Sequence, residues 1–191
     1  MSKDKNIVEM VSGCVKGDRK SQESLYKMYY GKMMGICMRY ADNSDEAKDI
    51  LQEGFIKVFN SLSKFDFEGS FEGWIKKIMV NTAIDSFRKN KKTIKIFDKN
   101  VALENLDQRQ EDDYDNSVSN NIKTAELLEA IQKLTPAYKT VFNLYVIDGY
   151  SHQQIADALN ISVGTSKSNY SKAKQNLQKF LQNKKLIINE S

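Results

Sequence analysis

Histidine, proline and cysteine are scarce in this chain of 191 residues. It has a single histidine, His152, a single proline, Pro136, and two cysteines, Cys14 and Cys37, that do not form a CxxC pair. One histidine leaves zinc catalysis and histidine-based catalytic triads without their usual parts. Two separated thiols are more typical of small buried side chains than of a disulfide or a metal site. We therefore expect neither a metal nor another cofactor.

Long apolar runs are absent as well. No window approaches the roughly 18 apolar residues of a membrane span, and the N-terminal residues lead into no signal-peptide core. We therefore expect a cytoplasmic protein without membrane insertion. With hydrophobic residues at 40% and charged residues at 28%, the composition is ordinary for a folded chain. Helix-forming residues recur at three- and four-residue spacings while glycine and proline are few, which predicts an all-α fold.

Charge is distributed unevenly along the chain. Residues 71–97 hold seven basic and two acidic side chains, whereas residues 98–126 hold three basic and eight acidic ones. Residues 151–191 are basic again, with six bases and two acids. This pattern predicts two small helical domains joined by a flexible acidic linker. Solvated helix faces with compensating loop charge would explain the charge pattern equally well if it were the only signal. The predicted boundaries are 1–95, 96–122 and 123–185.

A helix with two different faces is predicted at 44–62. Ser44 is a suitable N-cap, and Asp45 and Glu46 fall in the first turn, where the helix dipole favours acids. The opposite face carries Ile56 among acids and amides. A solvated face is the simpler interpretation, yet an apolar anchor ringed by polar groups also suits a protein interface. The face predicted to be buried consists of Ala47, Ile50, Leu51, Phe55, Val58, Phe59 and Leu62.

An aromatic and basic segment follows at 65–92. Its aromatic side chains are interleaved with bases and amides, a pattern that can stack unpaired nucleic-acid bases while cations hold the phosphates. A structural role competes with this hypothesis, because Phe71, Trp74 and Ile78 also have the spacing of a helix core. The segment alone therefore leaves both interpretations open.

The C-terminal residues predict a helix-turn-helix. Ser151 and Gln154 form a capping box for one helix, Asn160 tolerates the left-handed conformation of a tight turn, and Ser162 can cap the next helix. That last helix offers short polar and cationic side chains to a DNA major groove. A plain helical hairpin is the competing interpretation. The positions predicted to be buried are Val141, Phe142, Tyr145, Ile155, Ala156, Leu159, Ser166, Tyr170, Ala173 and Leu177.

Taken together, these blocks resemble one known family. Residues 45–59, DEAKDILQEGFIKVF, resemble the polymerase-binding helix of bacterial RNA polymerase sigma factors. Residues 71–88 resemble the promoter-melting helix of the same domain. Residues 149–157 and 161–168 are similar to the family's region-four reader of the upstream promoter element. The order and spacing of the blocks match the two-domain extracytoplasmic-function (ECF) subgroup.

The resemblance implies a sigma factor, which is not an enzyme. Such a protein binds core RNA polymerase, recognises the minus-thirty-five and minus-ten promoter elements and promotes promoter melting. Its implied partners are core RNA polymerase, promoter DNA as duplex and as melted non-template strand, and, as a further candidate, an anti-sigma factor. The implied domains are region two at 1–95 and region four at 123–185.

The resemblance also assigns roles to individual residues. The implied contacts with core polymerase are Asp45, Asp49, Gln52, Glu53 and Ile56. The implied contacts with minus-ten DNA are Phe65, Phe67, Ser70, Phe71, Trp74, Lys77, Asn81 and Arg88. The implied contacts with minus-thirty-five DNA are Lys167, Ser168, Asn169, Ser171 and Lys172. Family members often carry arginines where this chain has Asn169 and Lys172, and an apolar residue where it has Ser166. The two-pronged contacts of arginine with guanine are therefore lost at these positions.

Two other classes of function compete with this one. A stand-alone helix-turn-helix repressor would need neither the 44–62 helix nor the aromatic segment. A nuclease could use Asp45, Glu46 and Asp49, but no metal-ligand cluster joins these carboxylates in the sequence, and the helix dipole explains their position. An assay of binding to core polymerase distinguishes a sigma factor from a repressor. A metal-dependent cleavage assay distinguishes a sigma factor from a nuclease.

Overall fold

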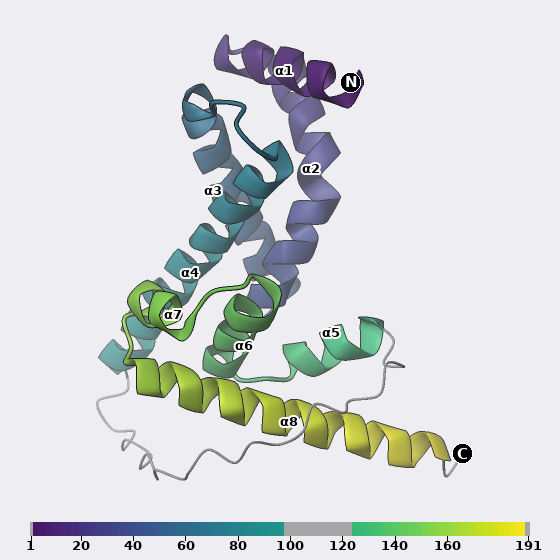
Figure 1. Ribbon diagram of the computed structural model, residues 1–191, viewed down its shortest axis with the longest axis vertical. Helices are drawn as coiled ribbons and strands as arrows, with labels where there is room; N and C mark the ends of the chain where they lie inside the picture. Colours follow the sequence, from purple (N-terminus) through teal and green to yellow (C-terminus); the bar gives the residue numbers. More distant parts are fainter. Residues whose placement is uncertain (1, 98–123, 190–191) are drawn as a thin grey trace.

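The computed structural model describes residues 2–97 and 124–189, with side chains described within 6–90 and 127–182. All regular structure in these ranges is helical (Figure 1), which confirms the all-α prediction with two helical units. The first unit contains α1 (Ser2–Val15), α2 (Arg19–Tyr40), α3 (Ser44–Ser61), the short η1 (Leu62–Lys64) and α4 (Phe71–Phe97). The second contains α5 (Thr124–Gln132), α6 (Pro136–Phe142), η2 (Asn143–Ile147), α7 (His152–Leu159) and α8 (Val163–Asn189).

The predictions about the cysteines, membrane helices, a metal site and the linker are taken next. Both cysteines are free and buried, as predicted. Within the described part of the chain, no helix combines the length and apolarity needed to cross a bilayer. The same residues contain no group of histidine, cysteine and carboxylate side chains that could hold a metal ion. The predicted linker at 96–122 lies outside the described residues, apart from the last two residues of α4.

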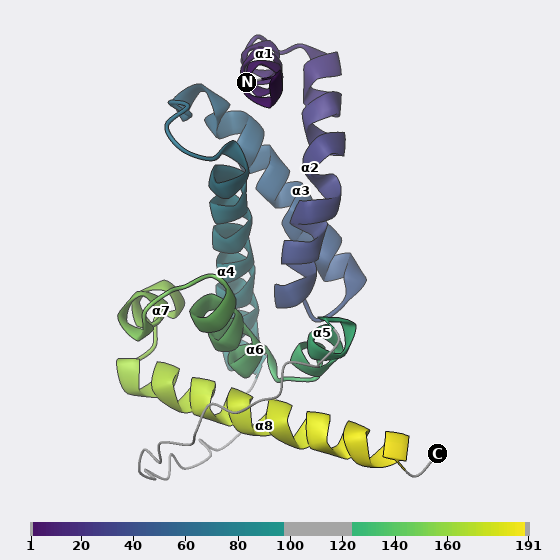
Figure 2. The same cartoon turned by 45° about the vertical axis from the view of Figure 1, so that its right-hand side comes forward.

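The core of the first unit is formed by α2, α3 and α4, and α1 packs across one end of α2 (Figures 1 and 2). The predicted buried face of α3 is confirmed, except that Phe59 is only half-buried. Gly54 allows α3 to approach α4 closely, because a Cβ atom at this position would lie 2.3 Å from Sδ of Met79. Apolar side chains no more than 2% exposed fill the space between the helices: Leu25, Met33, Leu51, Val58, Ile75 and Met79.

The N-terminus of α3 differs from the prediction in one detail. Asn43, and not Ser44, is the N-cap, because only residue 43 has the extended backbone that places its side chain over the first turn. The Oδ1 atom of Asn43 accepts hydrogen bonds from the backbone N–H groups of Asp45 at 3.0 Å and Glu46 at 2.9 Å. Ser44 is instead the first helical residue. The predicted acids in the first turn are confirmed.

The second unit has the predicted helix-turn-helix. Asn160 adopts the left-handed conformation, with φ 52° and ψ 57°, and the capping box of Ser151 and Gln154 is complete. Of the predicted core positions, Tyr170 is only half-buried, and Tyr145 is wrong, since it is 37% exposed whereas Leu144 is fully buried. The reason is that η2 is a π-helical turn, whose wider ring shifts the side-chain register that a regular α-helix would have. The smaller cluster of buried residues here is Ala130, Ile131, Leu134, Phe142, Ala173 and Leu177.

The two units pack against each other along a contact that we call the seam. It forms where α5, α6 and α7 meet the C-terminal halves of α2 and α4 (Figures 1 and 2). Val141 and Leu144 of the second unit are completely buried and belong to the same contiguous apolar cluster as the core of the first unit. Apolar contact therefore continues from one unit into the other.

Polar side chains also cross the seam. The ammonium group of Lys139, whose side chain is 1% exposed, lies 2.7 Å from Oδ1 of Asp42 and donates to the carbonyl oxygen of Ala41 at 2.9 Å. The buried side-chain amide of Asn143 donates to the carbonyl oxygen of Arg39 at 2.7 Å. These bonds satisfy the last carbonyl groups of α2, which have no partner within the helix itself.

Candidate functional site

The outer face of α3 presents the residues assigned to polymerase binding. Ile56 is 56% exposed, whereas Phe55 and Val58 on the other side of the same helix are buried. Glu53 is half-buried, because it pairs with Lys57 at 3.1 Å and with Lys89 of α4 at 3.5 Å. The hydrogen bond from Lys57 holds the pKa of Glu53 below its ordinary value, so this carboxylate is charged at neutral pH. The other assigned residues, Asp45, Asp49 and Gln52, are exposed.

The aromatic residues that precede and begin α4 divide into buried and exposed members. Phe65 is 7% exposed and Phe71 is 5% exposed, and their ring centroids are 5.0 Å apart. Trp74 is half-buried and stacks on Phe71 with centroids 5.8 Å apart. Phe67 is 46% exposed. In this arrangement Phe67 and part of Trp74 are open to an incoming base, whereas Phe65 and Phe71 are packed in the core.

The loop that carries Phe67 has an unusual backbone. Phe67 has a φ of 63° and Gly69 a φ of 86°, so two residues of this short loop are left-handed. A bulky residue rarely adopts this conformation, which costs of the order of 1–3 kcal/mol and concentrates at ligand-binding sites. The loop is held by Asp66, which accepts from the N–H of Glu68 at 2.9 Å, and by Ser70, which accepts from the N–H of Gly73 at 3.2 Å. No local sequence pattern predicted this strain.

The remaining minus-ten candidates lie further along α4. Lys77 and Asn81 are exposed, on the same helix as Trp74. Arg88 is half-buried: one guanidinium nitrogen donates to the carbonyl oxygen of Asp157 at 3.3 Å, and another lies 3.7 Å from Asp85. Arg88 is therefore occupied by contacts with α7 and with its own helix, while Lys77 and Asn81 face solvent.

The first turns of α8 form the second candidate interface. Ser162 caps the helix, because its Oγ atom accepts from the N–H of Thr165 at 2.9 Å. The assigned side chains lie opposite the buried Ala173 and Leu177. Among the five minus-thirty-five candidates, Lys167, Ser171 and Lys172 are exposed, whereas Ser168 and Asn169 are half-buried. The face is short, polar and cationic, as a helix in a major groove requires.

A buried serine of α8 contacts the histidine of α7. Ser166 is completely buried, and its Oγ atom lies 3.0 Å from Nδ1 of His152. The ring of His152 also stacks on Tyr145 with centroids 4.3 Å apart. Burial first, and the nearby charge of Lys167 second, lower the pKa of His152, so its neutral form is favoured. The single histidine thus links the two helices of the helix-turn-helix.

Sequence reasoning missed a cluster around Asp148. The side chain of Asp148 is 2% exposed, and its Oδ2 atom accepts a hydrogen bond from the hydroxyl of Tyr40. Its Oδ1 atom lies 2.9 Å from Nζ of Lys76 and 3.6 Å from a guanidinium nitrogen of Arg39. Burial first, and the Asp148 carboxylate second, raise the pKa of Tyr40, so its hydroxyl keeps its proton and donates. An acid at the C-terminal end of a helix opposes the helix dipole, and this was the available signal of a distant cationic partner.

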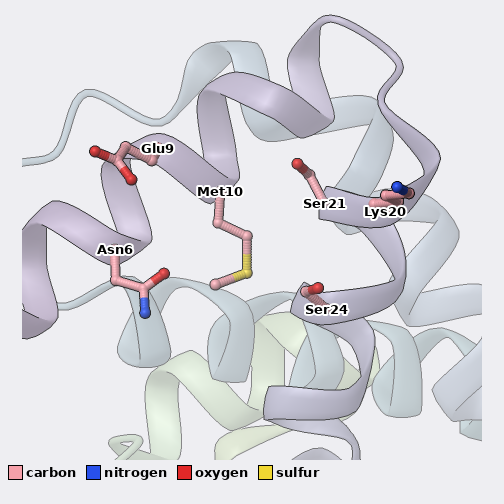
Figure 3. A pocket seen from close by; sticks show the side chains of 6 residues that line it. All are labelled: Asn6, Glu9, Met10, Lys20, Ser21 and Ser24. Carbon is pink, nitrogen blue, oxygen red and sulfur yellow. The ribbon is translucent and has the colours of Figure 1, made fainter.

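A separate hollow lies between α1 and α2, at the end of the molecule away from α8 (Figures 1 and 3). Its volume is about 260 Å³, and Met10 projects into it from α1. The other lining residues are polar and of mixed charge: Asn6, Glu9, Lys20, Ser21 and Ser24. These side chains do not form a cluster of one charge that would select a ligand, so the hollow is not a second candidate site.

Comparison with known proteins identifies similar families and relatives. Residues 25–93 match the family described as Sigma-70 region 2, and residues 124–177 match Sigma-70, region 4. The chain is 31% identical to the ECF RNA polymerase sigma factor SigW of Bacillus subtilis over 180 residues, which cover 92% of this chain and 96% of that protein. It is 28% identical to the ECF RNA polymerase sigma-E factor of Haemophilus influenzae, covering 94% of this chain and 95% of that one.

Solved structures include similar chains too. The sigma factor RpoE in its complex with the anti-sigma factor NepR from Bartonella quintana matches with a TM-score of 0.48 and 18% identity. The match covers 84% of this chain and 96% of the RpoE chain.

Proposed function

This chain belongs to the ECF family of RNA polymerase sigma factors, which act in transcription initiation and are not enzymes, and we propose how its surfaces divide that task. Sigma factors bind core RNA polymerase and promoter DNA. In our proposal the unit at 1–95 docks on core polymerase and holds the melted strand, and the unit at 123–185 reads upstream duplex. The linker at 96–122 connects them, and the protein works in the cytoplasm, where the polymerase is. An anti-sigma factor is a further proposed partner, on family membership alone.

The docking surface is the outer face of α3, and exposed Ile56 is the observation that carries this part of the proposal. Its side chain is 56% exposed and is surrounded by acids and an amide. An apolar anchor inside a polar rim is the usual composition of a protein interface. The proposed contacts are Asp45, Asp49, Gln52, Glu53 and Ile56.

The melted non-template strand is proposed to lie along the strained loop and the exposed face of α4. Phe67 and Trp74 offer ring faces to unpaired bases, and Lys77 supplies a cation for the backbone, which together suit single-strand binding. Phe65 and Phe71 support this surface from beneath, because their rings are buried. Ser70 and Asn81 are exposed hydrogen-bonding groups beside it. The partner of Arg88 in the structure is Asp157, so its contact with DNA requires this bond to break.

The proposed minus-thirty-five reader is the start of α8, which supplies Lys167, Ser168, Asn169, Ser171 and Lys172.

In this proposal, melting of the promoter needs no nucleotide hydrolysis. The first unit binds bases that have left the stack and does not bind them in the duplex, so the open promoter is favoured by differential binding.

A charge and polarity reversal on α3 tests the proposal. We expect Asp49→Lys combined with Ile56→Glu to abolish binding to core polymerase and run-off transcription, while the thermal unfolding of the chain stays unchanged. Glu53 is left intact in this variant, because its pairs with Lys57 and Lys89 join α3 to α4. The matched control is Glu9→Lys, an equal charge reversal at an exposed position of α1. Normal transcription by the double variant would refute the assignment of α3.

A further inference from the structure

A groove of about 590 Å³ runs between α2 and the start of α4. One end lies beside Ser70 of the strained loop, where Lys32 pairs with Glu72 at 2.5 Å. The other end is lined by Arg39 and Lys76. The groove therefore begins next to the proposed single-strand surface and ends at two cations.

The carboxylate that meets these two cations comes from the other unit. Asp148 lies 2.9 Å from Lys76 and 3.6 Å from Arg39, and it accepts a hydrogen bond from Tyr40. All three of these groups belong to the first unit, and together they surround one anion. The first unit thus supplies three donors around one anion, and the anion in the structure is a side chain of the second unit.

The fit of Asp148 in this site is incomplete. Its Oδ1 atom is buried and receives no hydrogen bond of proper geometry, although both cations are near. Lys76 still pairs with this oxygen at 2.9 Å, but the two oxygens of Asp148 face three donor groups, so an anion with more acceptor oxygens would satisfy the donors better. A phosphate group offers those oxygens and accepts from guanidinium, ammonium and hydroxyl donors alike.

We propose that Arg39, Lys76 and the Tyr40 hydroxyl bind a phosphodiester group of promoter DNA, and that Asp148 occupies this site while the two units are packed together. The proposal rests on the proposed function, because the DNA is the strand that leaves the loop at Ser70 and enters the groove. DNA and Asp148 then compete for one site. Binding of DNA there weakens the seam, and packing of the units weakens DNA binding by the same factor, so loss of Asp148 should strengthen DNA binding.

The test measures binding of a fluorescent forked oligonucleotide, taken from a promoter on which the wild-type holoenzyme gives run-off transcripts. For the free chain, we expect Asp148→Asn to raise the affinity by at least about fivefold. For the holoenzyme, we expect Lys76→Gln to lower the affinity and to reduce the slope of log K against log salt by about one. The Asp148→Asn gain should vanish when both substitutions are combined.

Lys27→Gln is the matched control, because Lys27 is exposed on the same helix as Arg39 and pairs only locally, with Glu23 at 2.5 Å. The proposal is overturned if Lys76→Gln binds DNA like Lys27→Gln, or if the Asp148→Asn gain persists unchanged in the combined variant. The side chain of Lys76 is 40% exposed, so its substitution leaves the fold intact and this arm is decisive by itself. A wild-type chain that fails to support transcription with core polymerase would instead refute the proposed function.

Discussion

The helices of the first unit and the seam between the units are held together by different kinds of contact. Inside the first unit, completely buried Leu51, Val58 and Met79 join α3 to its neighbours. At the seam, buried Lys139 and Asp148 contribute beside the apolar contact of Val141 and Leu144. Apolar side chains have no alternative partner in water, whereas polar side chains do. The difference indicates that the first unit is a permanent structure and that the seam can be exchanged for contacts with a partner.

The ion pair of Lys139 and Asp42 is a polar contact of this kind at the seam. Lys139 is almost completely buried, but the side chain of Asp42 is 51% exposed and remains in water. Removing an ammonium group from water costs several kcal/mol, and a half-solvated carboxylate recovers only part of this. The pair therefore fixes how the units are arranged more than it stabilises them.

The largest effect is expected in the core. Leu51→Ala should lower the free energy of unfolding of the first unit by about 2–5 kcal/mol, because a fully buried leucine leaves a cavity. Ile56→Ala, an apolar truncation on the exposed side of the same helix, should change stability by less than about 0.5 kcal/mol. Chemical denaturation of both variants measures the contrast. Equal losses would show that the two faces of α3 are not distinct in solution.

A smaller and different effect is expected at the seam. Lys139→Ala should weaken the packing of the units by about 1–3 kcal/mol, since the carbonyl of buried Ala41 loses its donor while Asp42 stays in water. Small-angle scattering should then show a larger radius of gyration, while the unfolding of the first unit is unchanged. Lys27→Ala serves as the control, because its pair with Glu23 is local and exposed. Unfolding of the first unit by Lys139→Ala would contradict the distinction between core and seam.

Replacing the charge with an apolar side chain sharpens the comparison. Lys139→Met keeps most of the side-chain volume and removes the cost of burying an ammonium group. We expect the packing of the units to change by less than about 1 kcal/mol, or to become tighter. The same scattering measurement applies, and a variant as expanded as Lys139→Ala would mean that the ion pair itself holds the seam.

The smallest effect concerns pH and the second unit. Because the pKa of His152 is lowered in the folded state, the unfolded chain binds more protons below its ordinary pKa of about 6.5. The stability due to neutral His152 is fully present above that pH and is lost as the pH falls below it. Melting of the second unit at about pH 7.5 and about pH 5.5 should therefore show a drop that His152→Gln reduces. An unchanged drop in the variant would exclude His152 as its source.

Local patterns in the sequence predicted much of this structure. The two faces of α3 and the capping box of Ser151 follow from residues a few positions apart, and both are confirmed. Tyr145 was placed wrongly because a π-helical turn changes the register without a clear sequence signal. The seam could not be predicted, since Asp42 and Lys139 are 97 positions apart and no local periodicity relates them.

The exposure of the candidate surfaces was predictable to a similar degree. The sequence selected the exposed face of α3 and the outer face of α8, because amphipathic spacing separates buried from exposed positions. It did not separate buried Phe65 and Phe71 from exposed Phe67, since the loop conformation decides which ring turns outward. Nor did it group Arg39 with Lys76, which come from different helices and are brought together only by packing.

The central claim is that the two units are packed together in the free chain and separate when core polymerase and promoter DNA are bound. Spin labels on cysteines introduced at Ser63 and Gln175, both exposed, would report the distance between the units by pulsed electron resonance. The native thiols do not interfere, because both are buried and burial raises the pKa of Cys37 to about 12. We predict one narrow distance distribution in the free chain and a different distance in the promoter complex. The same distance in both states would contradict the account.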